Sequence, residues 1–413
     1  MLSFEAKTMG SRTFVFVVAL ASLVSCGLRE IGESIAAGDG IWTGPGSVVV
    51  GNTSGKEGES KICYAVGVDY PDGYDWRADE EKGSVRCSLV VYADGIPLMK
   101  IPVGDEYEIS SDPDTHRIIE GCLYTDYSSD SETVIKRNGE TLFRYSGREM
   151  IIGMAMVDDE IYTLGQARDG EGFAFRINGD VVFEHQKGYL FPHLQMCEDC
   201  FSFAFYEPVE FEGTVQHRYY HYLGGEVCQI RVQQGVETVW DVIFHDNEVC
   251  YVASMFGMTV PVLVTGDLVS PMGVKGMAEM ISCRFVPSDD GLNVEGVMSQ
   301  SGKELFSCLW SGAQLHEVFQ LGYTAASVYA YADHIACVLN GQGMFVKGFI
   351  YCDGSSWEIP EGYMSIGGPV MVMIDGKLHV GLTSQEGEYA VIWTEEKIKP
   401  LKINGFISHM SAG

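Results

Sequence analysis

The strongest constraint on the fold is an internal repeat of about 43 residues that runs through most of this 413-residue chain. One set of anchors is a short apolar run with the character of a β-strand. These runs begin at Ile62, Cys122, Ile161, Phe201, Val249, Leu292, Ile335 and Leu378. The last three intervals are 43 residues each, so the chain is read as copies of one structural unit.

A second set of anchors consists of turn residues further along each repeat. These turns are Asp94-Gly95, Asn138-Gly139, Asn178-Gly179, Gly224-Gly225, Gly266-Asp267, Ser311-Gly312, Asp353-Gly354 and Glu395-Glu396. Most of these turns lie between two short runs of aromatic or branched residues that are predicted to be strands. Asn-Gly and Asp-Gly in that setting are strong hairpin signals. Two independent anchor sets therefore give eight copies.

Each copy holds four predicted strands. The third copy shows them best, as IIGMAMV, IYTLGQA, FAFRI and DVVFE. Four-stranded antiparallel units of this length are typical of β-propeller blades. We therefore expect an all-β fold, a β-propeller of eight blades, with seven as the alternative if one degenerate copy is a surface appendage.

The closure of the ring is also predicted. The segment 51–60 is polar and glycine-rich, so the first copy has no good first strand. After the eighth copy the chain adds an apolar run over 405–410. We expect this C-terminal strand to complete the first blade and to join the two ends of the propeller.

The N-terminus has the features of an export signal. A weakly basic start precedes an apolar run over 13–24, which is too short to span a bilayer. The run ends in Leu23-Val24-Ser25-Cys26, which resembles a bacterial lipoprotein signal. The resemblance implies a signal peptide over 1–25, lipidation of Cys26 and a linker over 26–60 before the propeller at 61–413. An ordinary cleaved signal with a chance cysteine is the alternative.

Two further resemblances concern fold and location. Gly367-Gly368 precede PVMVMIDGKLHVGL, and this pattern is similar to the diglycine and strand pair of a kelch blade. The chain as a whole resembles bacterial envelope lipoproteins that are β-propellers. Because Gly27 and not aspartate follows the lipidated cysteine, the lipoprotein resemblance implies an exported protein anchored to the outer membrane, with the leaflet left open.

The charge of the chain limits its partners. The formal net charge is −30, so a phosphate backbone or an anionic lipid surface would repel it. We therefore expect no nucleic-acid binding, and membrane contact through the lipid anchor alone.

Cysteines supply the first candidate site. Cys197 and Cys200 form a C-x-x-C pair at the predicted turn between the first and second strands of the fourth copy. The pair could be two thiols, a small disulfide, or a redox or metal group. Most other cysteines occupy strand positions that Val or Ala could fill, where cysteine behaves as a small hydrophobe.

Aromatic and histidine side chains supply the remaining candidates. On a strand over 217–222, the side chains of His217, Tyr219 and His221 share one face. This face could bind a ligand, or its rings could pack between blades. Trp76 lies in an acidic loop and could serve recognition. No pattern predicts a metal site or a cofactor.

These observations favour a binding or scaffold module, which presents its loops to a protein or glycan of the cell envelope. The alternative is a carbohydrate-active enzyme, a glycoside hydrolase or lyase, with acidic residues in the central funnel. The sequence singles out no catalytic residue, because propeller sites assemble from different blades.

Overall fold

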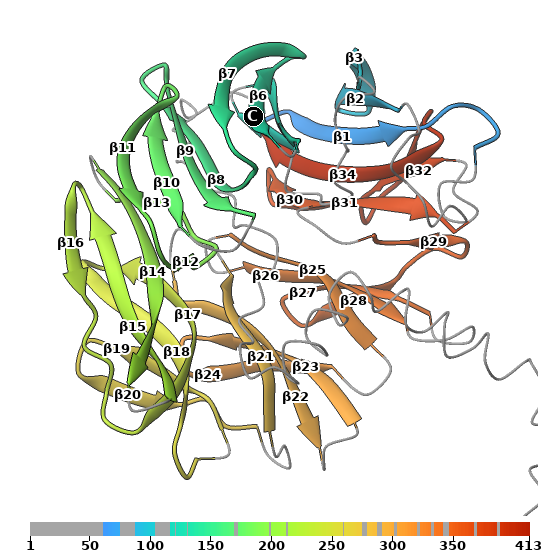
Figure 1. The fold of residues 1–413 in the computed structure, drawn as a ribbon. Coiled ribbons are helices and arrows are strands. Elements are labelled where there is room, and N and C mark those ends of the chain that lie inside the picture. Colours follow the sequence, from blue (N-terminus) through green and yellow to red (C-terminus); the bar gives the residue numbers. More distant parts are fainter. Residues whose placement is uncertain are drawn as a thin grey trace, which may run out of the picture. The chain divides into compact units, whose positions relative to one another are not determined.

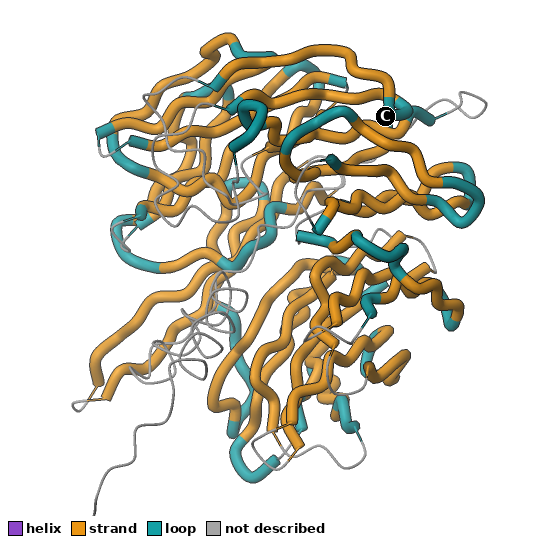
Figure 2. Tube along the Cα trace, turned by 90° about the vertical axis from the view of Figure 1, so that its right-hand side faces the viewer, coloured by secondary structure: helices purple, strands orange, loops and turns teal. Residues whose placement is uncertain are grey.

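A computed structural model describes residues 61–74, 87–103, 116–119, 121–129, 131–168, 172–197, 200–211, 214–258, 260–274, 279–286, 291–300, 304–319, 323–331, 334–341, 347–366, 370–385 and 389–413. Within these ranges the chain forms strands and loops, and no residue is helical (Figure 2). The described part accordingly holds no helix with the length and apolar character of a membrane span.

Eight antiparallel sheets form the blades of an eight-bladed β-propeller (Figure 1). Blade one is β34 (Gly405–Ala412), β1 (Cys63–Asp69), β2 (Ser88–Ala93) and β3 (Ile96–Pro102). Blade two is β4 (His116–Ile119), β5 (Cys122–Ser128), β6 (Glu132–Arg137) and β7 (Glu140–Ser146). Blade three is β8 (Glu149–Val157), β9 (Glu160–Ala167), β10 (Phe173–Ile177) and β11 (Asp180–His185). Blade four is β12 (Tyr189–Leu190), β13 (Gln195–Cys197), β14 (Cys200–Phe211), β15 (Thr214–Leu223) and β16 (Glu226–Gln229).

The other four blades repeat this order. Blade five is β17 (Val236–His245), β18 (Glu248–Met255), β19 (Val262–Thr265) and β20 (Leu268–Pro271). Blade six is β21 (Glu279–Val286), β22 (Asn293–Gln300), β23 (Glu304–Ser311) and β24 (Gln314–Phe319). Blade seven is β25 (Tyr323–Tyr331), β26 (His334–Gly341), β27 (Phe349–Cys352) and β28 (Ser355–Glu358). Blade eight is β29 (Tyr363–Met364), β30 (Met371–Ile374), β31 (Lys377–Ser384), β32 (Ala390–Trp393) and β33 (Ile398–Leu401). The predicted fold class and the number of eight blades are confirmed.

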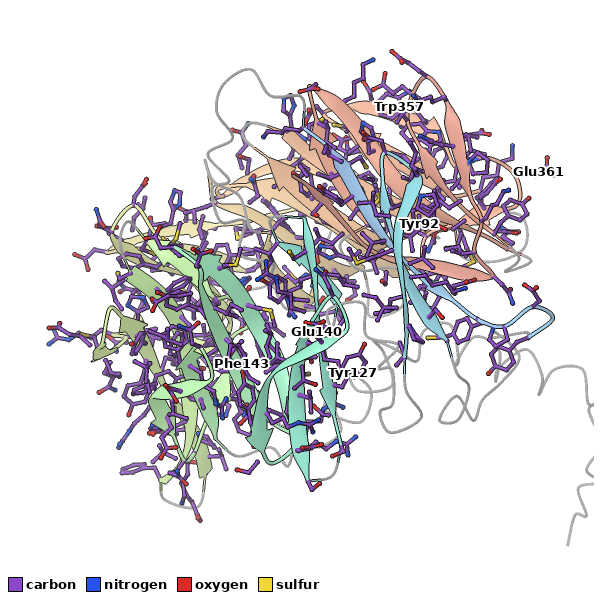
Figure 3. The ribbon with its side chains drawn as sticks, turned by 90° about the horizontal axis from the view of Figure 1, so that it is seen from above. Tyr92, Tyr127, Glu140, Phe143, Trp357 and Glu361 are labelled. Carbon is purple, nitrogen blue, oxygen red and sulfur yellow. The ribbon has the colours of Figure 1, made fainter. Side chains whose placement is uncertain are left out.

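The predicted closure is confirmed as well. The C-terminal strand β34 pairs antiparallel with β1 and completes blade one. The Ile62 amide donates to the Gly413 carbonyl at 2.8 Å, and the Gly413 amide donates back at 3.0 Å. Blade one also packs on blade eight, where Tyr92 (Figure 3) donates its hydroxyl to the Lys402 carbonyl at 3.3 Å. The two ends of the propeller are therefore joined by backbone pairing and by packing.

The second anchor set marks the turns between the third and fourth strands of the blades. In four blades the turn begins with an Asx residue at positive φ, whose side-chain oxygen accepts the amide of a second-strand residue. The pairs are Asp94 with Cys63 (3.0 Å), Asn138 with Leu123 (2.9 Å), Asn178 with Ile161 (2.9 Å) and Asp353 with Ile335 (2.9 Å). Asn and Asp tolerate this conformation and satisfy a neighbouring amide, which explains why the repeat uses them.

The hydrophobic core lies between neighbouring blades. In the largest aromatic cluster, between blades three and four, Phe203 stacks on Tyr222 at 4.5 Å and contacts Phe175 at 5.5 Å between ring centroids.

Cysteines fill small positions of the core between other blades, as predicted. Burial raises the pKa of Cys63 and Cys250 to about 12. None of the eleven cysteines that the structure describes forms a disulfide.

A polar network joins the innermost strands of blades four, five and six. The innermost strand of blade four is divided into β12 and β13, and His193 lies in the break. Its Nε2 lies 2.6 Å from Oδ2 of Asp241 on β17, and both side chains are buried. The same carboxylate oxygen accepts the Phe285 amide of β21 at 2.8 Å. One buried carboxylate thus connects three blades.

Candidate functional site

The strands β14 and β15 are longer than the rest of blade four (Figure 1). They pair from Ser202 with Leu223 out to Phe211 with Thr214. Their neighbours reach only part of this length, since β12 pairs as far as Tyr206 and β16 pairs with 220–223. We call the segments 207–211 and 214–218 the blade-four arm. It is a two-stranded ribbon, and in the described part of the chain no third strand pairs with it.

The base of the arm is attached to blade three on one side. Glu207 on β14 pairs with Arg218 in register and directs its carboxylate to blade three. That carboxylate contacts Nε2 of His185 at the end of β11 and accepts the Tyr220 hydroxyl at 3.2 Å. Burial is the largest cause that raises the pKa of Tyr220, followed by the charge of Glu207, so the phenol stays protonated and donates. The contact fixes where the arm begins.

Aromatic rings hold the other side of the base. The His217 ring meets the Tyr206 ring edge-on at 5.0 Å between centroids. Tyr206 stacks on Tyr189 of β12 at 5.2 Å. Tyr206 is buried, whereas His217 is partly exposed. Both faces of the ribbon are therefore packed at its base.

The outer end of the arm exposes apolar surface. Phe211 is 56 % exposed and Val215 is 59 % exposed. A charged residue, Glu210, lies directly opposite Val215 and is also exposed. Tyr and Phe side chains supply much of the binding energy of protein interfaces, so an exposed ring on a projecting ribbon is suited to contact a partner.

The three residues that the sequence placed on one face do share it, but they differ in accessibility. Tyr219 and His221 are buried between blades four and five. The Tyr219 hydroxyl accepts the Val239 amide at 3.4 Å, and the His221 ring stacks on Phe244 at 4.8 Å. The rings of Tyr219 and His221 are thus packed between blades, and His217 is the one residue of the three that is partly exposed.

The C-x-x-C pair flanks a turn as predicted, since β13 ends at Cys197 and β14 begins at Cys200. The two residues are opposite each other in the register of these strands. Both are thiols, and the structure does not contain the disulfide that the sequence left open. The Cys200 thiol instead donates to the Cys197 carbonyl at 3.4 Å.

Several predicted residues lie outside the described residues. These are the lipidation residue Cys26, the loop residue Trp76 and the diglycine Gly367-Gly368. Within the described ranges, no group of three His, Cys, Asp or Glu side chains is placed to hold a metal ion.

Sequence reasoning missed the arm as a unit, although it identified His217 beside it. A signal was present in the spacing of the repeat. In the fourth copy Phe201 and Gly224 are 23 positions apart, whereas in the third copy Ile161 and Asn178 are 17 positions apart. The extra residues form the outer part of the hairpin.

No protein-family model matches the chain, and no curated protein matches it. Solved structures are similar in fold. The dihydro-heme d1 dehydrogenase NirN in complex with DHE is 10 % identical over 83 % of this chain and 73 % of that chain, with a TM-score of 0.47. The β-propeller domain of the Trilobed protease from Pyrococcus furiosus is 10 % identical over 73 % of this chain and 92 % of that chain, with a TM-score of 0.43. The acylaminoacyl peptidase from Pyrococcus horikoshii is 10 % identical over 81 % of this chain and 56 % of its own, with a TM-score of 0.45. At this identity the likenesses concern the fold alone.

Proposed function

We propose that this chain is a lipid-anchored binding module of the bacterial cell envelope, which contacts a protein partner through the blade-four arm. The propeller fold supports a binding or scaffold role in general, because it holds loops and hairpins on a rigid ring. One observation carries the assignment to the arm. The arm projects beyond the sheet that it belongs to and exposes Phe211 and Val215 at its outer end.

A protein partner is favoured over a glycan by the chemistry of the outer end. Phe211 and Val215 offer apolar area on opposite faces of the ribbon. Thr214 and Gln216 share the face of Phe211, and the exposed Glu210 shares the face of Val215. Glycan sites usually combine an aromatic platform with several polar groups that converge on it. The converging polar groups of this region, Glu207 and its partners, lie at the base and are engaged with each other.

The location rests on the sequence. The apolar run over 13–24 followed by Leu23-Val24-Ser25-Cys26 supports export and lipidation of Cys26, and the resemblance to envelope lipoproteins supports the outer membrane. The formal charge of −30 supports attachment by the lipid, not by electrostatic attraction to the bilayer.

Site-specific cross-linking in cells tests the proposal. A photoreactive residue at Phe211 is expected to give a covalent adduct with one envelope protein. The same residue at Leu268, which is 63 % exposed on the outer strand of blade five, is the matched control and should give none. The captured protein, once purified, should bind the wild-type chain and bind a Phe211→Ser variant at least about tenfold more weakly. Equal capture at both positions would refute the assignment to the arm.

A further inference from the structure

A turn of blade five presents a second exposed apolar site. Phe256 follows β18 and is 81 % exposed, and Met258 beside it is exposed as well. The Met258 amide donates to the Met255 carbonyl at 3.0 Å, and Gly257 has a φ of 77°, which together define a tight turn that needs glycine at its third position. The Phe256 amide also donates to the Gly235 carbonyl at 2.7 Å. The backbone therefore fixes where the ring is displayed.

This turn lies at the same end of the propeller as the arm. In each blade the second strand runs away from the turn that joins it to the first strand, so β14 and β18 end on the same side. The segment 230–235 connects the two sites. Its Ile230 amide donates to the Tyr219 carbonyl on β15 at 2.8 Å, and its Gln233 amide donates to the Tyr251 hydroxyl on β18 at 2.9 Å.

Val215 lies on the face of the arm that is turned toward blade five. It shares this face with Tyr219 and His221, which are buried between blades four and five. The connecting segment adds a further exposed apolar side chain, that of Val232. We call these exposed residues at one end of two neighbouring blades the four-five corner: Val215, Val232, Phe256 and Met258.

The loops that form the four-five corner carry no charge. Residues 232–236 and 249–266 contain no Asp, Glu, Lys or Arg, although one residue in five of the chain is charged. Charged residues are depleted at the centre of protein interfaces, whereas aromatic residues and methionine are enriched. The composition of these loops therefore matches the centre of an interface with an uncharged, apolar surface.

The shape of this end favours a protein over a bilayer as the occupant. From corresponding turns, Phe211 is 11 positions beyond the start of β14, whereas Phe256 is 8 positions beyond the start of β18. At about 3.3 Å per residue, the outer end of the arm reaches about 10 Å beyond Phe256. A flat lipid surface would meet the arm and its exposed Glu210 first, whereas a folded protein can fill the step. The formal charge of −30 disfavours a second copy of this chain.

We infer that the four-five corner is a second contact site for the protein that binds the arm, and that it receives an uncharged, apolar surface of this partner. The inference rests on the proposed function, since it names a further part of the same interface. The partner lies against the blade-five side of the arm and buries Val215 and Phe256 in one continuous contact.

Cross-linking in cells tests the inference with a photoreactive residue at Phe256. Mass spectrometry of the adduct should identify the same protein that the residue at Phe211 captures. Leu268 is exposed on the same blade at the opposite end, and this matched control should give no adduct. A lipid, a second copy of this chain or a different protein in the adduct would overturn the inference, and so would the absence of any adduct at Phe256.

Binding of the purified partner supplies a second measurement. The protein captured at Phe211 should bind Phe256→Ser at least about tenfold more weakly than it binds the wild type, because a buried aromatic contact is lost. Leu268→Ser should bind as the wild type does. Both replaced side chains are exposed, so both variants should keep the melting temperature of the wild type.

The two proposals can fail separately. Capture at Phe211 combined with equal binding of Phe256→Ser and the wild type would leave the proposed function standing and refute the role of the four-five corner. Absence of capture at Phe211 would refute the assignment to the arm and the inference with it.

Discussion

The buried histidine of blade four should make the stability of the propeller depend on pH. The His221 side chain is 6 % exposed, its Nε2 lies 2.7 Å from the Ser202 hydroxyl, and its ring stacks on Phe244. Burial lowers its pKa from 6.5 to about 4. The folded state therefore keeps the ring neutral between pH 6.5 and pH 4, while the unfolded state takes up a proton. Stability is fully present above pH 6.5 and falls as the pH is lowered toward 4.

The magnitude follows from the two pKa values. A difference of about 2.5 pKa units corresponds to about 3 kcal/mol once the pH is below both values. Between pH 7 and pH 4.5 the loss from this one side chain should be about 2.5 kcal/mol. His221→Gln keeps a group that can bond Ser202 but cannot be protonated in this range, so this pH-dependent part of the free energy of unfolding should disappear in the variant.

Equilibrium urea unfolding of the wild type and the variant at a series of pH values measures the effect. The difference in the free energy of unfolding between the two chains should change by about 2.5 kcal/mol from pH 7 to pH 4.5. Parallel profiles for wild type and His221→Gln would refute the argument from burial.

Three further perturbations have defined outcomes. Asn178→Ala removes the oxygen that accepts the Ile161 amide and puts Ala at a φ of 51°, so thermal unfolding should show a loss of about 2 kcal/mol, whereas Asn178→Asp, which keeps the oxygen, should lose much less. Gly165→Ala places a methyl group against the Glu149 carboxylate, which forms a largely buried bidentate pair with Arg176 on β10. Calorimetry should show a loss of about 3 kcal/mol, and an unchanged melting temperature would contradict this packing. Cys26→Ser should abolish incorporation of a labelled fatty acid, and equal labelling of both chains would exclude lipidation at Cys26.

The architecture could be predicted because its signals are local and repeated. Each hairpin between third and fourth strands carries its own turn residues, and Asn138 and Asn178 show the reason: both hold positive φ and bind a second-strand amide. The closing strand was predictable for a different reason. An apolar run over 405–410 was left over at one end, and the first blade lacked a strand at the other.

Features that depend on contacts between blades could not be predicted from local sequence signals. The division of the first strand of blade four places His193 beside Asp241, and these residues are 48 positions apart in the sequence. Nothing local distinguishes them from exposed polar residues. The burial of Tyr219 and His221 likewise depends on blade five, which supplies Val239 and Phe244. A strand pattern shows which side chains share a face, but the neighbouring blade decides whether that face is covered.

The base of the arm is packed against neighbouring side chains, whereas in the described part of the chain no further strand pairs with its outer part. An isolated two-stranded ribbon is marginally stable in water, so the order of 207–211 and 214–218 depends on what holds the base of the arm. That role falls to Glu207, which is bound by His185 and Tyr220, and to His217 on Tyr206. Removing the Glu207 carboxylate should therefore loosen the arm while the blades stay folded.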